Sequence, residues 1–180
     1  MTWVIVISTI LLVILTIALF FLYTYNHFQE YIIRINEADA SIDAVLRKRF
    51  DLLNKSVDFI KETVDTDTIL PTIIRLRSQS VSNVELDKEL YSAIEEFQSY
   101  AERFENIKKN EGYVKTQINL MESESEIVAL RKYYNDITVD YNKLVSAFPS
   151  KIVAFFKKYN RKDLYEERKE KKSILDELKA

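Results

Sequence analysis

The sequence predicts an all-α protein in which an N-terminal transmembrane helix continues into an antiparallel four-helix bundle, followed by a charged helical tail. Two observations predict this fold class. The 180 residues include only one glycine and two prolines, whereas strand-rich folds need turn residues far more often. Apolar residues also recur at helical spacing over most of the chain. We therefore expect an anchor over residues 1–25, a bundle over 26–156 and a tail over 157–180.

The anchor is predicted from the 19-residue run Val4–Leu22, whose only polar residues are Ser8, Thr9 and Thr16. No Asp, Glu, Lys or Arg occurs before Glu30. A helix of about 20 apolar residues matches the ~30 Å hydrocarbon core of a bilayer. A cleaved signal peptide is the competing interpretation, but it would begin with a basic segment and have a shorter apolar run. We expect an uncleaved anchor in the cell membrane.

The charges beside the anchor favour one orientation. The N-terminal flank contains no Lys or Arg, whereas the other flank brings Arg34 and then Arg47, Lys48 and Arg49. Basic flanks tend to stay on the cytoplasmic side of a membrane. We expect a single-pass protein with its N-terminus outside and its helical domain in the cytoplasm.

The first helix is expected to run from the anchor without a break to about Val64, because neither glycine nor proline occurs before Pro71. Its buried face is marked by apolar residues at helical spacing. These are Ile35, Ala38, Ile42, Val45, Leu46, Leu53, Val57, Ile60 and Val64.

Three further helices are expected. A short one begins at about Pro71 and ends at about Arg77, since proline suits the first helical turn. A third helix covers about 84–109, and Gly112 then serves as its C-cap. The fourth, over about 113–147, has apolar residues at intervals of seven and ends at a Phe-Pro-Ser sequence. Its heptad row contains Tyr113, Leu120, Ile127, Tyr134, Tyr141 and Phe148.

Two stretches resemble the signature of the LemA family. The first is Glu37–Leu53 (EADASIDAVLRKRFDLL), preceded by Tyr25-Asn26; the second combines RKYYN, DYN, FPS and IVA between Arg131 and Ala154. Asn54 stands where that family often has proline. The resemblance covers about residues 20–155 and implies an antiparallel four-helix bundle on a membrane anchor. It implies no catalytic residues.

The composition argues against an enzyme. The chain has no cysteine and a single histidine, His27, so triads and thiolate metal sites cannot be built. Asp39 and Asp43 are one turn apart and Arg47 follows one turn later, which indicates a salt-bridge ladder rather than an acid/base pair. The net charge of −2 does not suit a nucleic-acid-binding protein. We expect no metal, cofactor, nucleic acid or small-molecule substrate.

A polar bridge is predicted between the first and fourth helices. The fourth helix has a row of polar residues that interrupts its apolar pattern, including Glu124 and Arg131. Counting helical rise from the membrane along two antiparallel helices places Asp43 opposite Arg131. The same count places Arg49 opposite Glu124.

The segment after the fourth helix combines apolar and basic residues. An even number of bundle crossings returns it to the membrane side, so we expect it to lie on the surface of an anionic leaflet. The alternative is that Ile152, Phe155 and Phe156 plug the open end of the bundle. The residues predicted to contact the membrane are Ile152, Phe155, Phe156, Lys157, Lys158, Arg161 and Lys162.

Two functions are compatible with these features. The first is a non-enzymatic scaffold or adaptor that presents a helical bundle beside the lipid bilayer, binding a protein partner or a second copy of itself. The alternative is a membrane-surface remodelling or lipid-organising protein that acts through its apolar-basic C-terminal segment.

Overall fold

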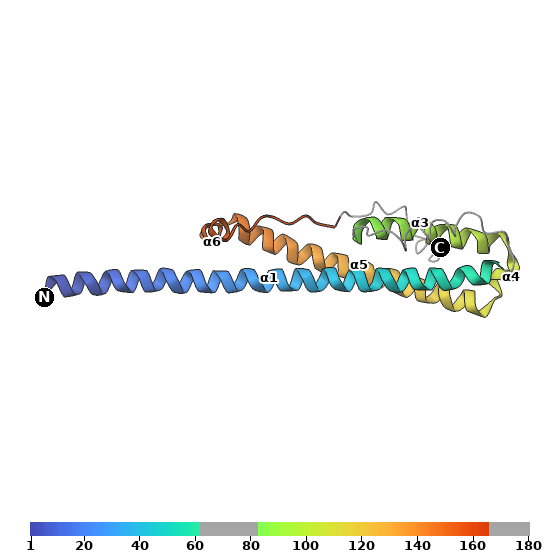
Figure 1. Cartoon of the computed structure of the whole chain (residues 1–180), viewed down its shortest axis with the longest axis horizontal. Helices are drawn as coiled ribbons and strands as arrows, with labels where there is room; N and C mark the ends of the chain where they lie inside the picture. The colour runs from blue at the N-terminus through green and yellow to red at the C-terminus, as the bar shows by residue number, and fades with distance from the viewer. Residues whose placement is uncertain (62–82, 166–180) are drawn as a thin grey trace, which may run out of the picture.

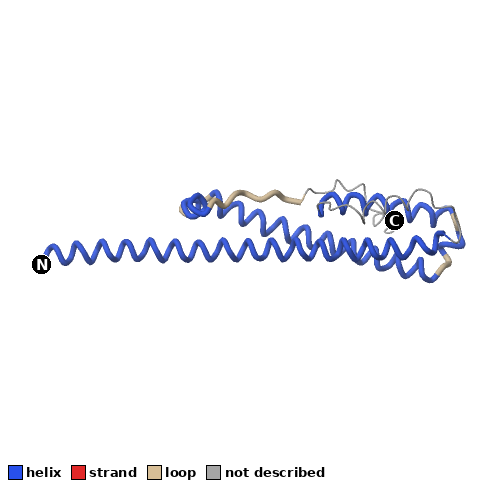
Figure 2. Tube along the Cα trace, viewed as in Figure 1, coloured by secondary structure: helices blue, strands red, loops and turns tan. Residues whose placement is uncertain are grey.

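The computed structural model describes residues 1–61 and 83–165 and confirms the all-α fold. Helices are the only regular elements in these residues (Figure 2). The expected short helix at 71–77 lies outside the described residues. The described elements are α1 (Thr2–Lys61), α3 (Asn83–Arg103), α4 (Glu105–Lys108), α5 (Glu111–Ser146) and α6 (Ser150–Lys157).

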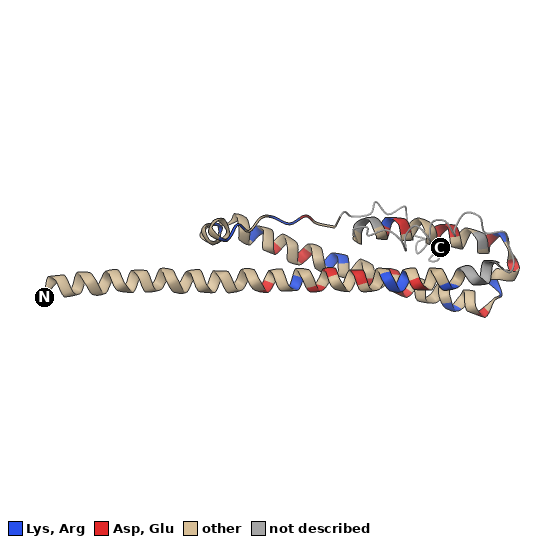
Figure 3. Ribbon diagram, in the orientation of Figure 1, with Lys and Arg blue, Asp and Glu red and all other residues tan. Residues whose placement is uncertain are grey.

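Helix α1 is a 60-residue rod that begins alone and ends inside the bundle (Figure 1). At 1.5 Å per residue it is about 90 Å long. Every residue of its first third, 1–20, is exposed, and this part of the rod carries no charge (Figure 3). Within the described residues it is the one helix long and apolar enough to cross a membrane. The exposed third therefore has the length and composition of a membrane anchor.

Helices α3 and α5 pack along the remaining part of α1. Figure 1 shows α3 running in the same direction as α1, α4 at the far end of the rod, and α5 returning along α1 toward the N-terminal side. This return places α6 beside the part of α1 that leaves the anchor. The antiparallel arrangement of α1 and α5 agrees with the prediction from the sequence.

In the part of the chain that the structure describes, the core has two clusters at different distances from the apolar run. In the outer cluster, Leu46 of α1 packs with Phe97 of α3 and Ile127 of α5. In the inner cluster, Phe28 of α1 packs with Tyr141 of α5 and residues of α6. The predicted apolar stripe of α1 is buried in these clusters wherever it is described: Ile35, Ala38, Ile42, Val45, Leu46 and Leu53.

Two local predictions around the third helix were wrong. The expected 84–109 helix is broken at Phe104, whose backbone is extended (φ −126°, ψ 102°). Gly112 does not end this helix; it lies in the first turn of α5. There the Asn110 side chain caps α5, its oxygen accepting hydrogen bonds from the N–H groups of Gly112 (2.8 Å) and Tyr113 (3.3 Å).

The tail also differs from the prediction. It was expected to be helical from residue 157, but α6 ends at Lys157, and its C-cap residue Lys158 has a left-handed backbone (φ 56°). Residues 159–165 then follow α5 without helical structure (Figure 2). We call residues 159–165 the strap. The rest of the tail, from residue 166, lies outside the described part of the chain.

Candidate functional site

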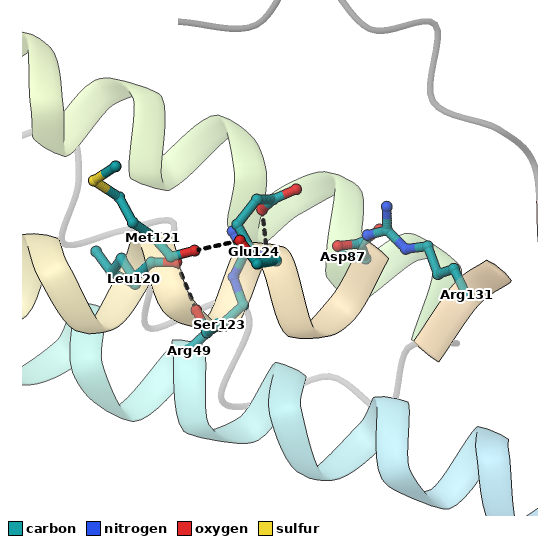
Figure 4. Close-up of polar contacts among 8 residues, drawn as sticks. Arg49, Asp87, Leu120, Met121, Ser123, Glu124 and Arg131 are labelled. Atoms are coloured by element: carbon teal, nitrogen blue, oxygen red, sulfur yellow. Dashed lines mark hydrogen bonds and ion pairs between the residues drawn. The ribbon is translucent and has the colours of Figure 1, made fainter. Parts of the chain in front are cut away.

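The predicted contact between Arg49 and Glu124 is present. The Arg49 Nη1 atom of α1 lies 2.5 Å from the Glu124 Oε2 atom of α5 (Figure 4). The Arg49 side chain is only 3% exposed, so its charge depends on this carboxylate in a region with little water. On the solvent side of the same interface, Lys48 and Glu126 make a looser pair at 3.6 Å.

The predicted contact between Asp43 and Arg131 is absent. Asp43 instead accepts a 2.7 Å hydrogen bond from Arg47, one turn further along α1. Arg131 forms its ion pair with Asp87 of α3 (Figure 4). The count along the helix axes gave the height of each residue but not its rotation about the axis. Arg131 faces α3, a third helix that supplies the competing carboxylate of Asp87.

Helix α6 is held against α1 where the rod leaves the anchor. Val153 and Ala154 are buried in the inner core cluster beside Phe28. The Lys157 ammonium lies 4.8 Å from the ring centroid of Tyr25, within range of a cation–π interaction. Tyr25 lies only three residues beyond the apolar run, so α6 is placed at the level where a bilayer would begin.

The outward face of α6 is strongly apolar and aromatic. Phe155 is 80% exposed and Phe156 is 70% exposed, and Phe148, just before α6, is 83% exposed. Ile152 is also exposed. The alternative in which Ile152, Phe155 and Phe156 plug the bundle is therefore wrong, because Val153 and Ala154 do the packing. The basic residues Lys157, Lys158 and Arg161 are exposed and Lys162 is half-buried.

Two asparagines of α5 hold the strap by its main chain. The Asn142 amide donates to the Lys162 carbonyl oxygen at 2.8 Å and accepts from the Lys162 N–H at 2.8 Å. Asn135 makes the same pair of bonds with the main chain of Tyr165, at 3.2 and 2.8 Å. Each side chain thus binds one residue of the strap as a neighbouring β-strand would. We call Asn135 and Asn142 the asparagine clamp.

Tyr165 anchors the end of the strap. Its ring is buried in the outer core cluster and meets Tyr134 edge to face, with centroids 4.8 Å apart. Its hydroxyl donates a 3.1 Å hydrogen bond to Asp39 of α1. Burial, and then the nearby Asp39 carboxylate, raise the pKa of Tyr165 far above its usual value, so the ring is held as a neutral hydrogen-bond donor.

Sequence reasoning missed the strap. The available signal was the repeated Tyr-Asn pair, Tyr134-Asn135 and Tyr141-Asn142, which places two amides seven residues apart on one helix face. The apolar pattern of α5 places both tyrosines in the core, where Tyr141 is buried and Tyr134 is half-buried. The asparagine beside each tyrosine had no assigned role.

The outer face of α5 carries a second apolar surface. Val114, Ile118, Met121 and Val128 are all exposed. They are spaced by four, three and seven residues, which places them on one side of a helix. We call these four residues the α5 stripe.

His27 lies five residues beyond the apolar run of α1. Its ring stacks on Tyr23 and meets Tyr31 edge-on, and its Nδ1 atom lies 3.6 Å from a Glu30 carboxylate oxygen. In the residues that the structure describes, no group of three or more His, Asp or Glu side chains is arranged to hold a metal ion. His27 therefore lies between two aromatic rings, Tyr23 and Tyr31, of the helix that carries the apolar run.

The buried polar bridge predicts unequal effects for two neighbouring glutamates. Replacing Glu124 with Ala removes the carboxylate beside the buried Arg49 charge and should lower the free energy of unfolding by about 2 kcal/mol, since Glu124 is itself partly hydrated. Glu126→Ala removes a solvated pair and should cost about 0–0.5 kcal/mol. Denaturant unfolding in detergent measures both values. Equal losses of unfolding free energy at the two positions would show that the buried Arg49–Glu124 pair contributes no more to stability than the solvated Lys48–Glu126 pair.

Comparison with known proteins supports the family resemblance. The family model described as "LemA family" matches residues 38–175, which is more than half of the chain. The match therefore includes much of the tail, which the resemblance in the sequence had left out. A search of curated proteins gives no significant match. The chain belongs to the LemA family.

Proposed function

We propose that this protein is a non-enzymatic scaffold or adaptor, anchored in the cell membrane by the first third of α1. In this proposal the N-terminus lies outside and the bundle lies in the cytoplasm, which the basic residues Arg34, Arg47, Lys48 and Arg49 support. The rod holds its binding surface at a defined distance from the bilayer. The expected partner is a helical protein or a second copy of the chain.

The observation that carries this proposal is the α5 stripe. Exposed apolar residues in a row on a rigid helix are typical of helix-to-helix recognition. Met121 adds an adaptable side chain at the middle of the row. Antiparallel pairing of α1 and α5 puts Ile118 opposite about residue 56 of the rod, near its far end. Ile118 therefore lies roughly 50 Å beyond the apolar run at helical rise.

Site-specific photo-crosslinking in native membranes tests the scaffold proposal. A photoreactive residue at Ile118 should trap a protein partner in stoichiometric amounts, because this position faces outward within the stripe. The matched control is the same residue at Arg47, an exposed position on α1. Absence of any adduct from Ile118, or equal labelling from Arg47, would contradict a partner surface on α5.

A specific observation also favours the alternative function, in which the protein organises the membrane surface. The exposed Phe148, Phe155 and Phe156 face outward at the level of Tyr25. Aromatic rings beside basic residues suit the boundary between headgroups and acyl chains. On this proposal α6 inserts its outer face into the cytoplasmic leaflet, and Lys157, Lys158, Arg161 and Lys162 attract anionic lipids.

Tryptophan quenching by brominated lipids tests this insertion. In a Trp3→Phe background, which removes the only native tryptophan, Phe155→Trp should be quenched in reconstituted bilayers. Tyr133→Trp is the matched control, an exposed position on α5 that lies roughly 28 Å beyond the apolar run by the same helical count. If the two tryptophans are quenched equally weakly, α6 does not enter the leaflet.

The charge contribution can be separated in the same assay. Each basic residue near an anionic leaflet contributes ~1 kcal/mol. Adding Gln substitutions at Lys157, Lys158, Arg161 and Lys162 to the Phe155→Trp variant should therefore reduce its quenching in anionic bilayers and leave it unchanged in neutral ones.

A further inference from the structure

The asparagine clamp recognises backbone rather than side chains. Asn142 uses both its amide hydrogen and its oxygen on the main chain of Lys162, and Asn135 does the same with Tyr165. A peptide N–H and C=O are present in almost every residue. We call each pair of hydrogen bonds, the one at Lys162 and the one at Tyr165, a rung. The two rungs therefore place little restriction on the amino-acid sequence that lies between them.

The spacing of the clamp matches an extended chain. Asn135 and Asn142 are seven residues apart on a helix, which is about 10.5 Å. Lys162 and Tyr165 are three residues apart, which in an extended chain is about 10 Å. The helix and the strap therefore come into register at both rungs.

Specificity comes from Tyr165. Its side chain is buried, whereas those of Asp163 and Leu164 are exposed and that of Lys162 is half-buried. The pocket combines an aromatic wall at Tyr134 with an acceptor at Asp39, and so suits a phenol ring. The site fits an extended segment with any residue except proline at the first rung and tyrosine three residues later.

We propose that the asparagine clamp and the Tyr165 pocket form a peptide-binding site that can be filled in trans, by the strap of a second copy of this chain. The proposal deepens the scaffold function, on which it rests, by naming a segment through which two copies join. An exchanged strap would make the same hydrogen bonds as the strap in cis, which is the basis of domain swapping.

Anchoring and reach both favour a second copy as the occupant. Because α1 of each copy enters the same bilayer at the same residue, the clamp of one copy lies at the same height as the strap of its neighbour. Tyr159 stays tied to α1 through its hydroxyl, which accepts a 2.6 Å hydrogen bond from Gln29. Residues 160–165 reach about 20 Å when extended, and about 15 Å of this is used along the axis, from the level of Gln29 to that of Asp39. About 13 Å remains for sideways reach, which covers the roughly 8–10 Å between packed helices, so exchange needs two copies whose α5 helices pack directly together.

Complementation between two defective full-length copies tests the exchange. Tyr165→Ala disables the strap and leaves the clamp intact; Asn135→Ala with Asn142→Ala disables the clamp and leaves the strap intact. The chain has no native cysteine, so Ala44→Cys can carry donor or acceptor dyes in either copy. Mixed in one bilayer, the two variants should give higher energy transfer than either variant with itself.

A copy carrying all three substitutions is the matched control and should give only background transfer with either partner. Should the mixed pair equal the like pairs, the strap acts in cis only and the proposal is overturned. Photo-crosslinking from Ile118 does not depend on the strap, so it would still report on the scaffold function. If circular dichroism shows that the Tyr165→Ala variant loses helix, the Lys162→Pro variant takes its place in the mixture. This variant lacks the N–H group that donates to Asn142.

Hydrogen exchange checks the clamp in the unmodified chain. The amides of Lys162 and Tyr165 should exchange more slowly than those of Asp163 and Leu164 between them. Asn142→Ala should speed exchange at Lys162 by roughly 2- to 10-fold, the loss expected for one side chain–backbone hydrogen bond. Uniformly fast exchange across residues 162–165 would show that the clamp holds nothing, and the proposal would fail.

Discussion

The continuity of α1 is the constraint on which the rest of the structure depends. With neither glycine nor proline among its residues, the helix has no point at which a bend is favoured. An apolar first third and an amphipathic remainder therefore belong to one rigid body. Any bilayer that holds the first part fixes the height and direction of everything packed on the second.

The register of α5 on α1 follows from that rod. Lys48 pairs with Glu126 and Arg49 with Glu124, so residue numbers in contact across the two helices sum to nearly the same value. Asp39 and Asn135 obey the same relation, since both contact Tyr165. The antiparallel return then carries α6 to Tyr25 and turns the strap back along α5. Exposed aromatic side chains at the level of Tyr25 and a backbone clamp further along α5 are both consequences of one helix register.

Much of this arrangement could be predicted from residue patterns. The apolar run, the uninterrupted α1 and the end of α5 before Pro149 are local signals, and each is present as expected. Axial height could also be predicted, because helical rise is constant. The rotation of each side chain about its helix axis could not be predicted. Arg131 pairs with Asp87 because α3 lies on that side of α5.

The break at Phe104 and the strap were not predictable from residue patterns. The conformation of the strap depends on tertiary contacts that outweigh local propensity, and the break at Phe104 places an extended residue where the apolar pattern continues. Residues after Lys158 are charged and were expected to be helical, yet backbone hydrogen bonds to Asn135 and Asn142 hold them extended. Tyr165 supplies the buried ring that fixes the end of the strap.

The distance between one membrane position and one bundle position tests the continuity of α1 most directly. Spin labels at Ile14→Cys and Ala44→Cys, 30 residues apart, can be measured by pulsed electron resonance in a reconstituted bilayer. A continuous helix predicts a single narrow distribution centred at about 45 Å. A broad distribution, or a clearly shorter mean distance, would reveal a hinge near residue 25 and contradict the account.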